Sequence, residues 1–141
     1  MTAAPEVPVA VMAFDRPAYL ARVLQSVVRQ RPSDRLTPKF FLFQDGAVSP
    51  RTGTAFADPA AIAASVAVFR RYLPEGVVVE AAHNLGVAMN FDRAERLLFD
   101  ELGYEFAIFL EDDMIIQNYY FDLIGELMGL REARDDIGMV S

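Results

Sequence analysis

Short apolar runs alternate with segments of helical periodicity along the chain. Residues 7–14, 40–43, 77–79 and 106–110 are continuous and rich in valine, phenylalanine and leucine, which is typical of strands buried on both faces. A further strand is expected to start at residues 137–141. Because a helical segment separates each strand from the next, the pattern predicts parallel strands joined by right-handed crossovers.

Apolar residues three and four positions apart predict four helices between and after these strands. The second begins with an acidic N-cap followed by proline, and the third ends at a glycine, both of which are common helix boundaries. The helices are expected to open at Asp15, at Asp58, after Gly86 and at Asn118. The predicted fold is therefore α/β, a mostly parallel sheet with helices on both faces in a Rossmann-like arrangement.

The length and the hydrophobic content describe one globular domain. The chain has 141 residues, of which 53% are hydrophobic, enough for a single sizeable core. No apolar run approaches the roughly 18 residues that a membrane span needs, and no basic segment precedes the first strand. The protein is therefore expected to be cytoplasmic, and twelve arginines against one lysine suggest a GC-rich bacterial genome.

Charge and residue usage exclude several kinds of site. The formal net charge is -7, which disfavours a nucleic-acid partner. The absence of cysteine and the presence of one histidine exclude disulfides, thiolate zinc sites and multi-histidine metal sites. A bound metal would therefore be held mainly through oxygen, which suggests magnesium, manganese or calcium.

Polar clusters follow the four predicted strands, at residues 15–16, 44–46, 83–84 and 111–113. Ligands of parallel α/β sheets bind beyond the carboxyl ends of the strands. If the strands are parallel, all four clusters meet along one edge. No GxGxxG follows the first strand, and no GxxxxGK[ST] or GxSxG occurs, which disfavours dinucleotide, P-loop and serine-hydrolase interpretations.

The acidic triplet Glu111, Asp112 and Asp113 is the strongest of these signals. Adjacent carboxylates repel one another and resist burial unless a cation compensates them. Strand alternation would place Glu111 and Asp113 on one face and Asp112 on the other. A divalent metal would take its other ligands from a diphosphate and water; alternatively, the triplet is an exposed turn.

Each of the other candidates also has a structural alternative. Asp45, with a glycine beside it, could accept a flat ligand or simply bond its own backbone. Arg16 could supply charge to a phosphate at the start of the first helix or be a solvated residue, and Asp15 could be that helix's N-cap. His83 and Asn84 either line the same pocket or shape the loop before the third helix.

Three motifs follow one another along the chain: AFDRP at residues 13–17, FQDG at residues 43–46 and LEDDM at residues 110–114. Together with the segment that follows through Ser141, they resemble the N-acetylglucosaminyltransferase I family of GT-A glycosyltransferases. The resemblance covers nearly the whole chain but only the donor-binding half of the family's catalytic domain. It implies one nucleotide-sugar-binding domain over residues 1–141, truncated on its acceptor side.

The family resemblance implies transfer of a sugar, commonly N-acetylglucosamine, from a UDP-sugar with Mn²⁺ (or Mg²⁺) as the cofactor. Asp113 of the DXD-like motif would ligate the metal. Glu111 and Asp112 would be the catalytic residues that also bind substrate, with Glu111 facing the donor sugar and Asp112 near the ribose or the metal shell. The acceptor is expected to be a hydroxyl of a glycan or of a protein-linked sugar, with inversion at the sugar.

The resemblance places the remaining candidates around the nucleotide. Asp45 would bond the uracil, Arg16 would lie beside the nucleotide together with Phe14 and Asp15, and His83 or Asn84 would line the pocket. The residue that deprotonates the acceptor would lie beyond Ser141. Two alternatives remain, a non-catalytic nucleotide-sugar-binding or assembly module and a metal-dependent phosphohydrolase that uses the acidic triplet.

Overall fold

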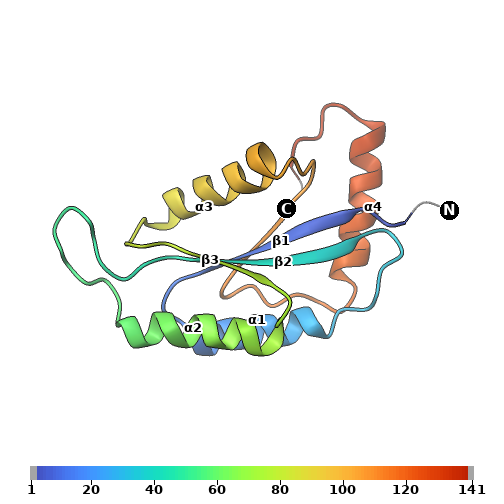
Figure 1. Ribbon diagram of the computed structural model, residues 1–141. Helices are drawn as coiled ribbons and strands as arrows, with labels where there is room; N and C mark the ends of the chain where they lie inside the picture. The colour runs from blue at the N-terminus through green and yellow to red at the C-terminus, as the bar shows by residue number, and fades with distance from the viewer. Residues whose placement is uncertain (1–2, 140–141) are drawn as a thin grey trace.

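Four parallel strands form the centre of the protein (Figure 1). The computed structural model describes residues 3–139. The sheet order is β3-β2-β1-β4, with the bounds β1 Glu6–Ala13, β2 Thr37–Gln44, β3 Val77–Glu80 and β4 Ile108–Glu111. Strand β1 pairs with both β2 and β4, and every pairing is parallel, which confirms the predicted sheet.

Helices cover both faces of the sheet, as the sequence pattern predicted (Figure 1). Their bounds are α1 Pro17–Val28, α2 Pro59–Tyr72, α3 Val87–Glu95 and α4 Tyr120–Ala133. Helix α3 continues directly into η1, a stretch of π-helix over Arg96–Glu101. Helices α1 and α2 lie side by side on one face, and α3 covers the opposite face.

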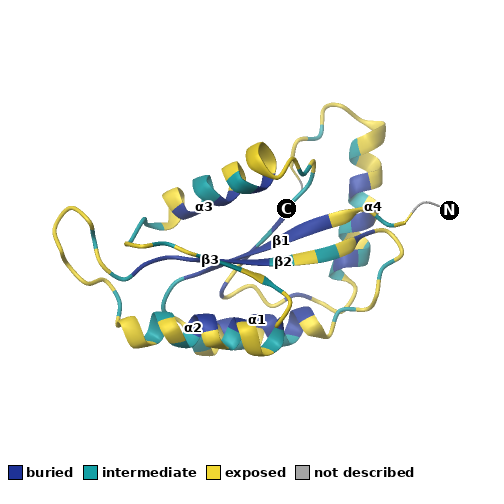
Figure 2. Cartoon of the chain, in the orientation of Figure 1, coloured by how far each residue is buried: buried dark blue, intermediate teal, exposed yellow. Residues whose placement is uncertain are grey.

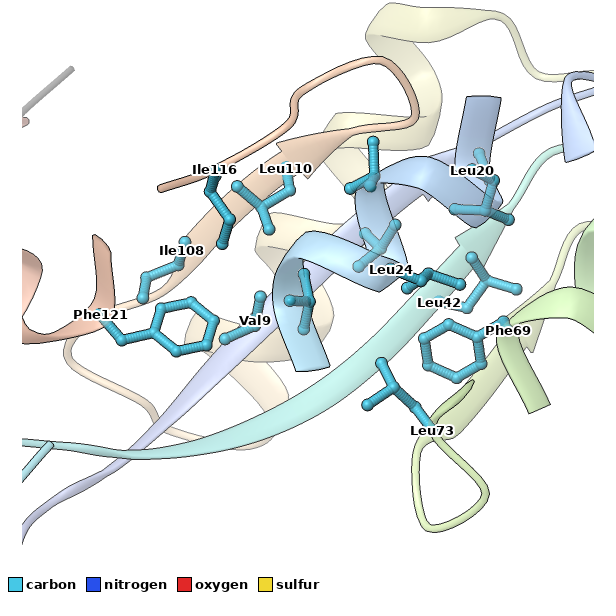
Figure 3. Close-up of a cluster of buried hydrophobic side chains, with 14 of the residues drawn as sticks. Val9, Leu20, Leu24, Leu42, Phe69, Leu73, Ile108, Leu110, Ile116 and Phe121 are labelled. Atoms are coloured by element: carbon cyan, nitrogen blue, oxygen red, sulfur yellow. The ribbon is translucent and has the colours of Figure 1, made fainter. Parts of the chain in front are cut away.

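The alternation of side chains along β1 divides the core into two clusters. Val9 and Val11 face α1 and α2, whereas Ala10 and Met12 face α3. In the larger cluster, Leu24 of α1 and Phe69 of α2 converge on Leu42 of β2 (Figure 3). Figure 2 shows the consequence: most of β1 and the second half of β2 are buried, and the long loop between β2 and α2 is mostly exposed. This two-sided burial explains why residues 7–13 of β1 and 41–43 of β2 are apolar.

The predicted helix boundaries are partly correct. The carboxylate of Asp58 accepts a hydrogen bond from Ala60 N at 2.9 Å, so the expected N-cap of α2 is confirmed. Gly103 follows η1 with a φ of +74°, the left-handed conformation expected of a glycine that ends a helix. The predicted cap Asn118 is wrong, because Tyr119 is the N-cap of α4 and makes no side-chain cap bond. Asp15 is likewise not the cap of α1, since Arg16 occupies that position.

The chain ends without the expected fifth strand in its described part. Residues 137–139 have no regular structure, and residues 140–141 lie outside the described residues. Among residues 3–139, every helix falls short of the length and apolarity required to cross a bilayer.

Candidate functional site

The four polar clusters predicted from the sequence lie at one edge of the sheet, where all four strands end. We call this the carboxyl edge. Backbone and side-chain bonds join neighbouring strand ends: Asp45 N donates to Ala13 O at 3.0 Å, and Gln44 Nε2 donates to Phe14 O at 2.6 Å. The edge carries two groups of contacts, one between the ends of β1 and β4 and one between the ends of β2 and β3.

Arg16 connects the end of β1 to the acidic triplet that begins at the last residue of β4. Its guanidinium forms an ion pair with Asp112, with Nε 3.4 Å from Oδ2, and its Nη2 lies 3.5 Å from Asp113 Oδ2. The Asp112 side chain is only 6% exposed, whereas that of Asp113 is 48% exposed. The hydrogen bond to Asp112 raises the pKa of Arg16, so the arginine is a permanent positive charge at this edge.

The ring of Tyr19 supports this arginine. It lies on the first turns of α1 and is half exposed, and the guanidinium carbon of Arg16 sits 5.4 Å from the ring centroid. A cation over an aromatic face is attracted by the ring quadrupole. Arg16 is therefore held between an aromatic ring and a buried carboxylate.

The burial of the three acidic residues agrees with the predicted alternation of side-chain faces, but their contacts with Arg16 do not. Glu111 and Asp113 are exposed and Asp112 is buried, as expected for alternate faces. However, β4 ends at Glu111 and a turn follows, so Arg16 reaches both Asp112 and Asp113. The alternative of a wholly exposed acidic turn is wrong, because Asp112 is buried and paired.

The carboxylates at this edge fit a divalent metal only in part. Within residues 3–139 no three acidic or histidine side chains gather closely enough to hold a metal by themselves. Magnesium and manganese at nucleotide sites commonly use one or two carboxylates and complete their shell with phosphate oxygens and water. Asp113 offers one such ligand, and the guanidinium of Arg16 already stands as a cation beside it. These side chains alone would therefore leave most of a metal's coordination shell to phosphate oxygens and water.

Asp45 organises the loop between β3 and α3. Its buried carboxylate accepts hydrogen bonds from Leu85 N at 2.8 Å, from Gly86 N at 3.0 Å and from Gly46 N at 2.8 Å. The amide of Asn84 also lies 3.4 Å from Asp45 Oδ2 and donates to Gly46 O at 3.0 Å. Asp45 therefore fixes the backbone that leads into α3.

Close backbone contact between Gly46 and His83 completes this group. A Cβ added at Gly46 would lie 2.4 Å from the carbonyl carbon of His83, so only glycine fits without displacing the loop. The His83 side chain itself is exposed, and Phe14 and Asp15 are half-buried at the end of β1. The predicted candidates thus share one edge, but Asp45 and Asn84 contact each other, whereas Arg16 contacts the triplet.

Two residues that the sequence analysis did not single out, Asn90 and Arg93, also hold this edge together. Asn90 of α3 is buried and donates to Phe43 O at 3.1 Å. Arg93 donates from Nη2 to Gln44 O and from Nε to Asn90 Oδ1. Burial lowers the pKa of Arg93, and its guanidinium also lies over the ring of Phe43. The sequence pattern could have identified Asn90, because it is a polar residue on the inward side of a predicted amphipathic helix.

Gln44 belongs to the predicted cluster at residues 44–46, but the sequence assigned it no role of its own. It is fully buried at the end of β2, and its Nε2 donates to Phe14 O and Asp45 O. Its Oε1 has no hydrogen-bond partner in the described structure. A glutamine directly after four apolar strand residues was the available sequence signal.

Comparisons with known proteins place these observations in a family context. The model of a protein family described as the GNT-I family matches residues 1–141. A search of curated proteins finds no match. Among solved structures, TarS residues 1–349 from S. aureus is similar with a TM-score of 0.58 and 16% identity, over 90% of this chain and 33% of that chain. The same fragment of TarS in complex with UDP is similar with a TM-score of 0.55 and 14% identity, over 96% of this chain and 38% of that chain.

These structural likenesses show the fold. The chain spans about a third of the length of the two TarS fragments that it matches. The part of TarS that resembles this chain has the same α/β architecture, in which a parallel sheet is covered by helices.

Proposed function

The chain belongs to the GNT-I family, and from this premise we propose that it forms the donor-binding part of a glycosyltransferase that uses a UDP-sugar. One observation carries the proposal: Arg16 and the acidic triplet contact each other at the carboxyl edge of a parallel sheet. Parallel α/β sheets bind their ligands at this edge. The similar TarS structure that contains UDP supports a uridine nucleotide as the ligand.

In this proposal, the two groups of the carboxyl edge bind different parts of the donor. Arg16 contacts the diphosphate, because a guanidinium forms strong charge-assisted hydrogen bonds with phosphate oxygens. The loop that Asp45 fixes forms the wall of the nucleoside pocket, with Asn84 and the exposed His83 on it. Phe14 and Asp15 would close the pocket beside Arg16.

The acidic triplet would bind the metal and contact the donor sugar. Asp113 would hold Mn²⁺ or Mg²⁺ together with the diphosphate, and a metal in this position supplies Lewis-acid stabilisation of the leaving group. The exposed Glu111 would face the donor sugar, for which we propose N-acetylglucosamine. Asp112, buried beside Arg16, would lie near the ribose or the metal shell. The proposed reaction is attack of an acceptor hydroxyl on a glycan or protein-linked sugar, with inversion at the anomeric carbon.

Calorimetric titration with UDP, with and without Mn²⁺, tests the proposal. We expect binding that strengthens when Mn²⁺ is present, and a loss of this metal dependence in Asp113→Ala. Asp100→Ala is the matched control, because Asp100 is exposed on η1, away from the carboxyl edge. Absence of metal-dependent binding, or an unchanged metal effect in Asp113→Ala, would refute the proposal.

A second measurement separates transfer from mere binding. The full-length protein would be supplied with UDP-N-acetylglucosamine, and release of UDP would be followed with and without candidate acceptors. UDP release supports the proposed transferase. Donor binding with neither transfer nor hydrolysis would instead assign the domain a binding or assembly role, and phosphate release from simple esters would indicate a phosphohydrolase.

A further inference from the structure

A positive charge, that of Arg16, lies directly beside the acidic triplet. Among residues 3–139, Arg16 is the cation that lies within ion-pair distance of Asp112 or Asp113. It contacts both, and Asp112 is almost fully buried. A buried carboxylate destabilises the fold unless a cation compensates its charge. Arg16 provides that positive charge, which a metal ion could otherwise provide.

The guanidinium and a divalent ion would compete for the same carboxylates. The Nη2 of Arg16 lies 3.5 Å from Asp113 Oδ2, and Asp113 is the residue proposed to ligate the metal. A unit charge within ~5 Å of a divalent ion opposes binding of that ion by a factor of about ten even at the dielectric constant of water. Metal binding therefore strengthens when the guanidinium moves away or when new negative charge arrives.

The position of Arg16 makes such a movement possible. Its side chain is 45% exposed, whereas that of Asp112 is 6% exposed. The arginine lies on the solvent side of the pair, over the ring of Tyr19, and can turn toward a ligand without unpacking the core. The diphosphate of a nucleotide-sugar carries two negative charges, as the two carboxylates together do, and its oxygens can bind the guanidinium through two parallel hydrogen bonds.

We propose that Arg16 is an internal counter-ion that keeps the divalent-cation site weak until a nucleoside diphosphate draws its guanidinium away from Asp112 and Asp113. Arg16 thereby couples binding of the metal to binding of the donor. The inference rests on the proposed function, and it gives Arg16 a role beyond contact with phosphate. Because coupling between two ligands is reciprocal, the metal strengthens nucleotide binding by the same factor that the nucleotide strengthens metal binding.

Removal of the guanidinium should have opposite effects on the two ligands. In Arg16→Gln without nucleotide, we expect the affinity for Mn²⁺ to rise about tenfold or more, because the competing charge is gone and Asp112 is left uncompensated. In the same variant we expect UDP binding to weaken and the Mn²⁺–UDP coupling to shrink. Arg16→Lys retains the charge and should bind Mn²⁺ as weakly as the wild-type protein.

The experiment measures Mn²⁺ binding by electron paramagnetic resonance of the free ion, with no nucleotide and then with saturating UDP. Arg22→Gln is the matched control, because it removes the same charge from an exposed position on the same helix and should leave Mn²⁺ affinity unchanged. Thermal unfolding with and without Mn²⁺ gives a second readout, in which Arg16→Gln should be stabilised by Mn²⁺ more than the wild-type protein is.

The possible results separate this inference from the proposed function. Tighter nucleotide-free Mn²⁺ binding in Arg16→Gln, with wild-type behaviour in Arg16→Lys, supports the counter-ion role. Unchanged or weaker Mn²⁺ binding in Arg16→Gln overturns it, even if the wild-type protein binds UDP and Mn²⁺ together. Failure of the wild-type protein to bind UDP overturns the proposed function, whereas the nucleotide-free comparison of variants still decides whether Arg16 opposes the metal.

Discussion

Substitution of Gly46 by alanine should displace the loop that forms one wall of the candidate site. The added Cβ would lie 2.4 Å from the carbonyl carbon and 2.5 Å from the carbonyl oxygen of His83. Both are backbone atoms, so the loop itself must move. Such overpacking costs about 1–3 kcal/mol. The movement also strains the bonds from Leu85 N and Gly86 N to Asp45, each worth about 0.5–1.5 kcal/mol.

The combined loss should be about 2–4 kcal/mol in the free energy of unfolding. Urea denaturation measures it directly, and the expected fall in Tm is roughly 10 °C for a chain of this size. Calorimetry should show weaker UDP binding, because the proposed nucleoside wall has moved.

Gly129→Ala is the matched control for this prediction. Gly129 lies within α4, and a Cβ there would meet no atom within 4 Å. Alanine in an exposed helix should stabilise the protein by about 0.5–1 kcal/mol. The same chemical change thus has opposite signs at the two positions, and a Gly46→Ala protein at least as stable as the wild type would refute the loop geometry described here.

Three further predictions follow from individual contacts. Asp58→Ala should lower the free energy of unfolding by about 0.5–2 kcal/mol through loss of the N-cap bond to Ala60 N, and urea denaturation that shows no change would contradict this cap. Asn90→Ala should lower the free energy of unfolding by about 1–3 kcal/mol, since it removes the bonds to Phe43 O and from Arg93. It should also weaken UDP binding more than Asp58→Ala does. Equal UDP affinity in the two variants would disprove the role of Asn90 at the site. The hydrogen bond from Tyr104 lowers the pKa of Glu6, so Tyr104→Phe should raise that pKa toward its ordinary value. This bond stabilises the fold at neutral pH and is lost as the pH falls through the pKa of Glu6. An NMR titration of Glu6 that is unchanged in Tyr104→Phe would contradict this prediction.

The sheet and its functional edge could be predicted from the sequence because both depend on local patterns. Continuous apolar runs such as residues 7–14 indicated strands buried on both faces, and the structure confirms that the strands are parallel. The position of Asp45 and of the acidic triplet directly after strands then placed them at one edge. This step required only the rule that parallel strands end on the same side.

Contacts between distant residues could not be predicted in the same way. The pairing of Arg16 with Asp112 joins residues 96 positions apart, and no local pattern specifies it. Asp45 appeared as a candidate contact for uracil, whereas the structure shows that backbone N–H groups of Leu85 and Gly86 already bind its carboxylate. The start of α4 was misplaced at Asn118 because a residue with a good capping side chain need not occupy the cap.

The central claim is that the carboxyl edge binds a nucleoside diphosphate together with a divalent cation, and a crystal structure grown with UDP and Mn²⁺ tests it most directly. Anomalous scattering would locate the manganese. The account predicts manganese beside Asp113, the diphosphate against Arg16, and a guanidinium turned away from Asp112 compared with the structure described here. Nucleotide bound elsewhere on the protein, or manganese remote from the acidic triplet, would contradict the account.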